Sequence, residues 1–258
     1  GEKKMEQNFI RRVTIDWDKV EETSYLRSIP ALFQLQSFEL NRPVTLFAGE
    51  NGTGKSTLLE AIAVAYGFNP EGGTLNYRFS TYDDVSPLSD VLQLSKGYRK
   101  AKWGYFFRAE SFFNLASKAE DYRKSDIWVK PKEIYYQRYG GRALHEQSHG
   151  ESFLSFFQGN EQPGLYLMDE PEASLSAQRQ LALLAQIVRM ARAGSQFLIA
   201  SHSPILLGIP DSEILSFDEG TIHPCDFEQT GSFQIFRLFL NQKEKVLHQL
   251  LEEQDETT

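Results

Sequence analysis

Residues 49–57, which read GENGTGKST, constrain the fold more than any other part of the chain. They match the pattern G-x-x-x-x-G-K-S, with an apolar run at 44–48 before them and a helical pattern at 58–63 after them. A strand, a glycine loop and a helix in this order let backbone N–H groups and the helix N-terminus face one anion. An ordinary glycine-rich turn would not need the full motif, so we predict a phosphate loop that binds a nucleoside triphosphate.

The loop residues have different predicted tasks. Lys55 is expected to reach the β- and γ-phosphates of ATP and to act in catalysis, and the Ser56 hydroxyl is expected to ligate Mg²⁺. The other predicted contacts to ATP come from neighbouring positions of the loop and the helix: Asn51, Gly52, Thr53, Gly54, Thr57.

Composition is that of a globular protein. With 258 residues and 41% hydrophobic content, the chain can bury a substantial core. The single cysteine, Cys225, excludes an intramolecular disulfide and has no cysteine partner for a zinc site. No apolar run approaches the roughly 20 residues of a membrane span, and no charged-then-apolar leader opens the sequence. We expect a soluble, cytoplasmic protein without a transmembrane segment of its own.

Strand and helix patterns alternate along most of the chain. Apolar runs or alternation predict strands at 11–17, 44–48, 102–107, 165–168 and 197–200. Apolar periodicity and stop signals predict helices at 58–67, 110–119 and 177–192, and two C-terminal helices over 233–251, broken near Asn241. The predicted fold class is therefore α/β, a phosphate-loop NTPase with a largely parallel sheet flanked by helices.

One domain is predicted to span residues 1–258. We divide it into a nucleotide-binding core lobe, residues 1–68 and 160–258, and an inserted smaller lobe, residues 69–159. The inserted lobe has no clean helical or strand period, and we expect it to be mixed or helical.

The stretch LYLMDE at 165–170 is an apolar strand that ends in Asp169 and Glu170. Beside a phosphate loop, the first acid is expected to hold Mg²⁺, and the second to orient and polarise the attacking water. A solvated strand end would explain the motif alone, but it does not explain why the motif accompanies a complete phosphate loop.

Two further motifs suit the same site. QSHGE at 147–151 could present a hydroxyl, backbone N–H groups and a helix N-terminus to an anion, although a simple N-cap would look alike. His202 follows the strand at 197–200 and could contact the γ-phosphate or the catalytic water. A lone histidine is more often structural, and we assign no role to His145 or His149.

In this order the motifs resemble those of the ABC-type ATPase head domain, and within it the SMC, RecF and OLD group of DNA-associated ATPases rather than transporter subunits. The chain looks most like the compact bacterial ATPases of this type. The resemblance rests on the phosphate loop, the signature at 147–151, DEPEASL at 169–175 and SHSPILL at 201–207. It implies ATP and Mg²⁺ as ligands and catalytic roles for Glu170 and His202. It also implies that Ser148, Gly150 and Glu151 contact nucleotide bound to a second subunit, so that two heads form a homodimer around ATP.

The chain departs from that family pattern at two places. Gln147 and His149 stand where the signature commonly has Leu and Gly. Where the family usually carries a glutamine after an aromatic strand, this chain has Arg108 or Glu110. Either residue is a candidate for that position.

Three functional classes are compatible with these motifs. The first is an ATPase switch or motor that acts on a nucleic-acid, repair or defence partner. The second is the nucleotide-binding subunit of a membrane ABC transporter, which would need a membrane protein partner. The third is a regulatory ATP-binding module with little turnover. The residues Arg108, Glu110 and the sequence SHSP favour the first class.

A basic segment at residues 96–142 supports a nucleic-acid partner. It holds 12 Lys and Arg against 5 Asp and Glu, a net charge of +7, while the whole chain has a net charge of -8. Aromatic residues are interleaved with the basic ones, a mixture that can bind phosphates and stack on the bases of DNA or RNA. The alternative is that the aromatic residues form the core of the inserted lobe and that the basic residues are its solvated face.

Overall fold

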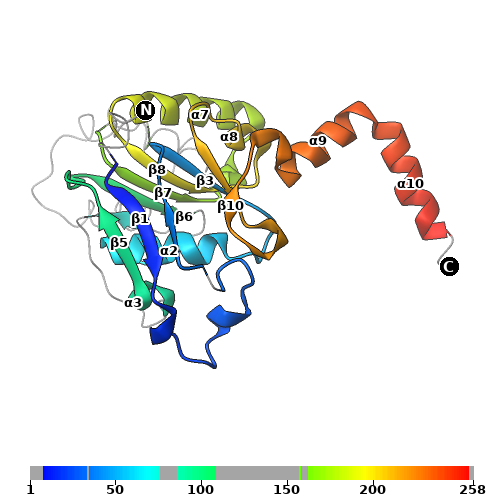
Figure 1. The fold of residues 1–258 in the computed structure, drawn as a ribbon. Coiled ribbons are helices and arrows are strands. Elements are labelled where there is room, and N and C mark those ends of the chain that lie inside the picture. Colours follow the sequence, from blue (N-terminus) through cyan, green and yellow to red (C-terminus); the bar gives the residue numbers. More distant parts are fainter. Residues whose placement is uncertain (1–7, 34, 76–85, 109–156, 158–161, 256–258) are drawn as a thin grey trace, which may run out of the picture.

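A seven-stranded sheet organises the molecule (Figure 1). The computed structural model describes residues 8–33, 35–75, 86–108, 157 and 162–255. The strand order is β10-β9-β3-β8-β7-β6-β4, and the five central strands are parallel. These parallel strands are β3 (Val44–Ala48), β6 (Gly104–Arg108), β7 (Leu165–Asp169), β8 (Gln196–Ala200) and β9 (Glu213–Ser216).

Antiparallel strands close both edges of this large sheet. β4 (Gly73–Thr74) pairs with β6, and β10 (His223–Pro224) pairs with β9. The chain therefore adopts the predicted α/β fold, with a largely parallel sheet and helices on both of its faces. All five residues of β3 and of β8 are buried. Their largely apolar sequences follow from this double coverage.

Two long helices cover the opposite faces of the sheet (Figure 1). The helix α2 (Lys55–Tyr66) buries Leu58, Leu59 and Ile62 against one face. The helix α7 (Ala177–Arg192) buries Leu183, Ile187 and Met190 against the other. On the α7 face, the rings of Tyr166 and Phe197 stack with their centroids 5.0 Å apart.

A separate three-stranded antiparallel sheet packs on the α2 side. Its order is β2-β1-β5, formed by β1 (Ile10–Ile15), β2 (Ser37–Glu39) and β5 (Leu92–Lys96). The buried side chain of Gln196 joins it to the large sheet. Its Oε1 accepts hydrogen bonds from the N–H groups of Phe9 and Ile10, and its Nε2 donates to the Ile10 carbonyl.

Short helices fill the connections. The α-helices are α3 (Leu88–Val91) and α8 (Pro204–Leu207), and the 3-10 helices are η1 (Trp17–Lys19), η2 (Tyr25–Ser28), η4 (Pro171–Ser174), η5 (Asp218–Gly220) and η6 (Phe227–Gln229). Two C-terminal helices, α9 (Gly231–Asn241) and α10 (Lys243–Asp255), extend away from the rest of the molecule (Figure 1). Among the described residues, no helix is long and apolar enough to cross a bilayer.

The predicted strands and helices agree with those observed to within a few residues. α7 occupies the predicted range 177–192, and the C-terminal helices break next to Asn241 as expected. α2 begins at Lys55, earlier than the helical pattern at 58, because the left-handed residue Gly54 caps it directly. The predicted helix at 110–119 lies outside the described residues.

The predicted lobe boundary at residue 69 does not coincide with an edge of the large sheet. β4 and β6, at residues 73–74 and 104–108, belong to that sheet although the sequence division assigned them to the inserted lobe. β5 joins the small sheet through β1. Residues 76–85, 109–156 and 158–159 of the inserted lobe, including the signature at 147–151, lie outside the described residues, and the division into lobes stays a prediction.

Candidate functional site

The phosphate loop leaves β3 at the carboxyl edge of the sheet and leads directly into α2. Gly54 has a φ of 99°, and a Cβ there would lie 2.8 Å from Cγ2 of Ile29, so both the backbone and the space require glycine. The loop borders a cavity of about 310 Å³. Its lining includes Ile29, Asn51, Gly52, Gly54, Lys55, Ser56, Thr57 and Glu170.

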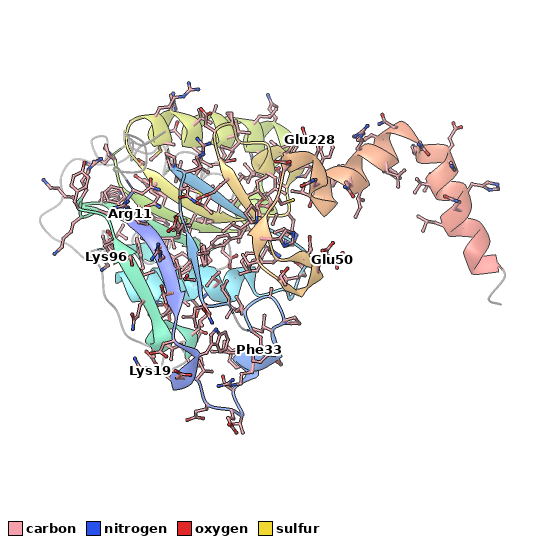
Figure 2. All side chains as sticks on the ribbon, viewed as in Figure 1. Arg11, Lys19, Phe33, Glu50, Lys96 and Glu228 are labelled. Atoms are coloured by element: carbon pink, nitrogen blue, oxygen red, sulfur yellow. The ribbon has the colours of Figure 1, made fainter. Side chains whose placement is uncertain are left out.

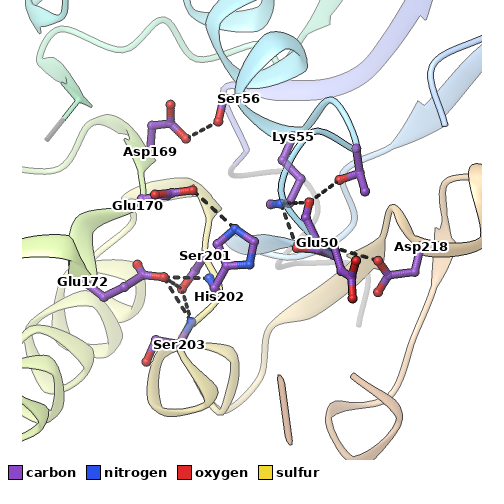
Figure 3. Close-up of polar contacts among 12 residues, drawn as sticks. Glu50, Lys55, Ser56, Asp169, Glu170, Glu172, Ser201, His202, Ser203 and Asp218 are labelled. Atoms are coloured by element: carbon purple, nitrogen blue, oxygen red, sulfur yellow. Dashed lines mark hydrogen bonds and ion pairs between the residues drawn. The ribbon is translucent and has the colours of Figure 1, made fainter. Parts of the chain in front are cut away.

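Lys55 is held at the bottom of this loop (Figure 3). Its Nζ donates to the carbonyl oxygens of Gly49, at 2.7 Å, and Glu50, at 2.6 Å. Burial lowers the pKa of Lys55 from its usual value, and the surrounding acids oppose that shift. Since an ammonium has three N–H donors, Lys55 keeps one for a phosphate oxygen after these two bonds.

Ser56 and Asp169 meet across the sheet edge. Ser56 Oγ donates to Asp169 Oδ1 at 2.8 Å, which joins the start of α2 to the end of β7. Burial raises the pKa of the Asp169 carboxyl, and the Ser56 hydrogen bond and the nearby Arg108 partly offset this shift. A hydroxyl and a carboxylate are hard oxygen donors of the kind that Mg²⁺ prefers, so the residues present fit this metal.

Glu170 occupies a strained turn immediately after β7. It adopts φ 47° and ψ 53°, a left-handed conformation that is uncommon for a residue with a side chain. Its N–H donates to the Ala200 carbonyl of the neighbouring strand β8. This turn directs the carboxylate, 43% exposed, toward the loop cavity, where it stands beside Lys55 and Ser56.

His202 approaches Glu170 from the end of β8. Its Nε2 lies 3.3 Å from Glu170 Oε1. That nitrogen is shielded from solvent and makes no hydrogen bond within the part of the chain that the structure describes. Buried polar atoms are normally paired, so the His202 nitrogen is a candidate for contact with a ligand. The structure thus brings together Lys55, Ser56, Asp169, Glu170 and His202, which come from three separate segments.

Two family profiles match this sequence. Residues 25–135 match one described as "AAA domain", and residues 142–208 match one described as "AAA domain, putative AbiEii toxin, Type IV TA system". The first covers the phosphate loop, and the second covers Asp169, Glu170 and His202. Together these two matches support an AAA/ABC-type ATPase head domain.

Individual proteins are similar to the head domain at low identity. A Haemophilus influenzae protein named "Uncharacterized ABC transporter ATP-binding protein" is 24% identical over 182 residues, which are 66% of this chain and 68% of that protein. The structure of cbiO1 from Clostridium perfringens, part of the ABC transporter complex cbiONQ, has 16% identity and a TM-score of 0.47, covering 95% of this chain and 99% of that one. The SMC head domain from Thermotoga maritima has 13% identity and a TM-score of 0.40, covering 84% and 99%.

Glu172 is a third carboxylate at the site, and the sequence analysis did not single it out. Glu172 Oε1 accepts from Ser201 Oγ at 2.8 Å, from His202 N at 2.6 Å and from Ser203 N at 3.0 Å (Figure 3). One oxygen of Glu172, in η4, therefore fixes the backbone that carries His202. The signal in the sequence was the third acid of DEPEASL, but the sequence did not show what it contacts.

Glu172→Ala is expected to lower kcat of the head domain about 10-fold, because it releases the backbone that holds His202 at Glu170. ATP affinity should stay within about 2-fold, and unfolding free energy should drop by about 1–3 kcal/mol from the lost buried hydrogen bonds. Glu172→Gln keeps a carbonyl acceptor and should recover most of the activity. Steady-state turnover, ATP titration and denaturant unfolding of both variants check this positioning role. Equal kcat in Glu172→Ala and the unmodified chain would contradict it.

Asp218, at the start of η5, is another residue that the sequence analysis missed. Its Oδ1 accepts from Glu50 N at 3.0 Å, and a Cβ on Gly49 would lie 3.1 Å from the same oxygen. Asp218 thus supports the entrance of the phosphate loop from the end of β9. No motif marked it, because β9 is short and was not predicted.

Arg108 ends β6 beside Asp169, its register partner on β7. Its Nη1 donates to Glu60 Oε2 at 2.8 Å and to the Pro70 carbonyl at 3.0 Å. The guanidinium is thus bound to α2 and the segment that follows it. Glu110, the other candidate for the family's glutamine position, lies outside the described residues, as do Ser148, Gly150, Glu151, His145 and His149.

Proposed function

We propose that this head domain binds ATP with Mg²⁺ and hydrolyses it to ADP and phosphate. The observation that carries the proposal is the 2.8 Å hydrogen bond between Ser56 and Asp169, next to Lys55 and Glu170. Ser56, Lys55 and Glu170 border one cavity, and Asp169 is hydrogen-bonded to Ser56. A hydroxyl, an ammonium and two carboxylates are the groups that phosphoryl transfer to water uses.

Each residue has a proposed task in hydrolysis. The loop N–H groups and Lys55 bind and orient the phosphates, and Ser56 and Asp169 hold the metal. Mg²⁺ held by these two residues would supply positive charge that neutralises the phosphates. Glu170 orients the attacking water and accepts its proton, while His202 donates from Nε2 to the γ-phosphate or to that water. The 3.3 Å separation of His202 and Glu170 supports this division, because one water or phosphate oxygen could contact both.

We further propose that a second copy completes the site. Glu170, which borders the cavity, has a side chain that is 43% exposed, so a γ-phosphate bound beside it would be accessible to water. Ser148 and Gly150 of the second copy would cover this phosphate, with Glu151 next to them. ATP would then hold two heads together and hydrolysis would release them, a switch between two states that differ in γ-phosphate contacts.

The partner that this switch acts on is proposed to be nucleic acid, in repair or defence. The basic segment at 96–142 and the defence-related description of the second family profile support this assignment. A transporter subunit is the second candidate, and the name of the Haemophilus influenzae relative favours it. Co-purification separates the two, since a transporter subunit would be recovered with a membrane protein and a nucleic-acid switch would be recovered with DNA or RNA.

DNA or RNA binding is expected to be weak, stimulated by ATP and sensitive to salt. Each phosphate contact that is lost should reduce the slope of log affinity against log salt by about 0.7 to 0.9. Lys130→Glu and Lys132→Glu together should therefore flatten that slope. Fluorescence anisotropy of labelled single- and double-stranded DNA, titrated at several salt concentrations, measures it.

Two controls make this measurement decisive. Lys19→Glu changes an exposed lysine of η1, outside the basic segment, and should leave the salt slope unaltered. Omitting ATP should weaken binding of the unmodified chain. If no complex forms at low salt with ATP and Mg²⁺ present, the nucleic-acid assignment is wrong and a protein or membrane partner is favoured.

A further inference from the structure

The C-terminal helices α9 and α10 form an arm whose large apolar side chains are exposed. Of the twelve large hydrophobic residues that are exposed in the described part of the chain, eight lie on this arm, each 38–75% exposed. Five are on α9: Ile235, Phe236, Leu238, Phe239 and Leu240. Three are on α10: Leu247, Leu250 and Leu251. Figure 2 shows the outer part of the arm standing apart from the other elements drawn.

The base of the arm is firmly attached to the head. Thr230 is buried, caps α9 by accepting from Phe233 N, and donates its hydroxyl to the Phe227 carbonyl at 2.7 Å. The rings of Phe227 and Phe233 lie 4.7 Å apart, and Phe227 packs against the core on the α7 side of the sheet. The arm thus begins as an ordered extension of the core, and only its outer part is uncovered.

We propose that the arm is a dimerisation element whose partner is the arm of a second copy of this chain, packed antiparallel. A helix that is apolar around most of its circumference needs a partner surface, and α9 has five apolar residues among six positions at 235–240. Eight side chains at about half exposure present on the order of 500–800 Å². This approaches the roughly 800 Å² per partner of a standard stable interface.

The charge order of α10 supports the antiparallel arrangement. The helix begins with Lys243, Glu244 and Lys245, and its last turns contain Glu252, Glu253 and Asp255. A net positive start and an acidic end oppose the helix dipole, which favours acids at the start and bases at the end. The order is therefore unfavourable for an isolated helix. In an antiparallel pair, however, the basic start of each α10 faces the acidic end of the other.

The same charges disfavour a membrane or nucleic acid as the occupant. Helices that lie on membranes carry lysine and arginine on their polar face, whereas α10 is net acidic in a chain with a net charge of -8. DNA and RNA would be repelled for the same reason. A self-complementary surface fits a two-fold symmetric dimer, in which the same patch of both copies is buried.

In this inference the arms link two heads permanently. It rests on the proposed function only for what this link does, which is to keep two ATPase heads together. Two heads joined by their arms remain close together, so their engagement around ATP becomes an intramolecular step. The arm dimer itself needs no nucleotide. It should form in Lys55→Ala as in the unmodified chain, so a failure of the ATPase proposal and a failure of the arm proposal give different results.

Sedimentation velocity without nucleotide, over a range of protein concentrations, tests the arm dimer. The unmodified chain is expected to sediment as a dimer, and Leu250→Glu should raise the dimer dissociation constant at least 100-fold. Leu181→Glu is the matched control, since Leu181 on α7 is 56% exposed, as is Leu250, but lies outside the arm. Circular dichroism of both variants checks that the fold is retained.

Charge reversal tests the antiparallel orientation. Lys243→Glu with Lys245→Glu should weaken the dimer, and so should Glu252→Lys with Glu253→Lys, whereas combining all four substitutions should restore it. A dimer strengthened by either reversal alone would overturn the antiparallel arrangement. A monomeric unmodified chain that pellets with phosphatidylglycerol vesicles would overturn the proposal in favour of a membrane. A chain monomeric at all concentrations and without vesicle binding would overturn it as well.

Discussion

Glu170→Gln is expected to slow ATP hydrolysis by about 100-fold or more while leaving ATP binding intact. The amide has almost the shape of the carboxylate, but it cannot accept a proton from the attacking water. Lys55, Ser56 and Asp169 would still bind nucleotide, because their contacts do not pass through the Glu170 carboxylate. Phosphate release gives the turnover, and equilibrium titration with ATP gives the affinity.

The control for Glu170→Gln is Glu228→Gln, which removes one exposed carboxylate from η6, outside the site. Its turnover should match that of the unmodified chain. Because the Glu170→Gln protein binds ATP but hydrolyses it slowly, it should also accumulate with two heads engaged around ATP. Turnover in Glu170→Gln equal to that of the control would remove Glu170 from the proposed role.

Ser148→Arg is the second substitution with a large expected effect. If the signature acts on nucleotide bound to the other subunit, the bulky cation should abolish turnover and ATP-driven engagement. ATP binding to the loop of the same subunit should be almost unchanged, since Lys55, Ser56 and Asp169 are intact. Förster transfer between labelled heads, with and without ATP, measures engagement even if the arms already hold two copies together.

Mixing two inactive variants distinguishes action between subunits from action within one. Ser148→Arg and Lys55→Ala each lack one half of the composite site. A mixed two-fold dimer pairs the intact loop of one copy with the intact signature of the other, so up to about a quarter of the sites should regain turnover. No recovery in the mixture, together with normal activity of Ser148→Arg alone, would refute the composite site.

The nucleotide-facing edge could be predicted because each of its parts has a local signature. Each part is a continuous stretch of sequence. These parts are the loop at 49–57, the strand that ends in Asp169 and Glu170, and the strand before His202. Parallel strands bring their carboxyl ends to the same edge of a sheet, so these pieces had to meet once the strands were recognised. The hydrogen bond from Ser56 to Asp169 is the outcome of that rule.

The small sheet could not be predicted for the opposite reason. β1 pairs with β5, about 80 positions later in the chain, and the polar face of each strand carries no mark of its partner. Gln196 joins the two sheets by hydrogen bonds to Phe9 and Ile10, and nothing in its local sequence indicates a buried amide. Contacts of this kind join segments that are distant in the sequence, so they follow from the assembled core and not from local sequence.

The supporting residues of the site were missed because they act on backbone rather than on ligand. Glu172 binds the segment around His202, and Asp218 binds the entrance of the phosphate loop. Both residues are acids that follow a strand. This pattern is common, and the contacts that such an acid makes depend on which residues of other segments lie opposite it. Arg108 shows the same limit, since the sequence left it as a candidate for the family's glutamine position and did not show that it binds Glu60.

The most direct test of the central claim is the identity of the products when the reaction runs in water enriched in ¹⁸O. If water oriented by Glu170 attacks the γ-phosphate, the chain with ATP and Mg²⁺ should release ADP and a phosphate that carries one solvent oxygen, as seen by mass spectrometry. The rate of ¹⁸O incorporation should collapse in Glu170→Gln. Release of AMP and pyrophosphate, or of phosphate without solvent oxygen, would contradict the proposed chemistry of this site.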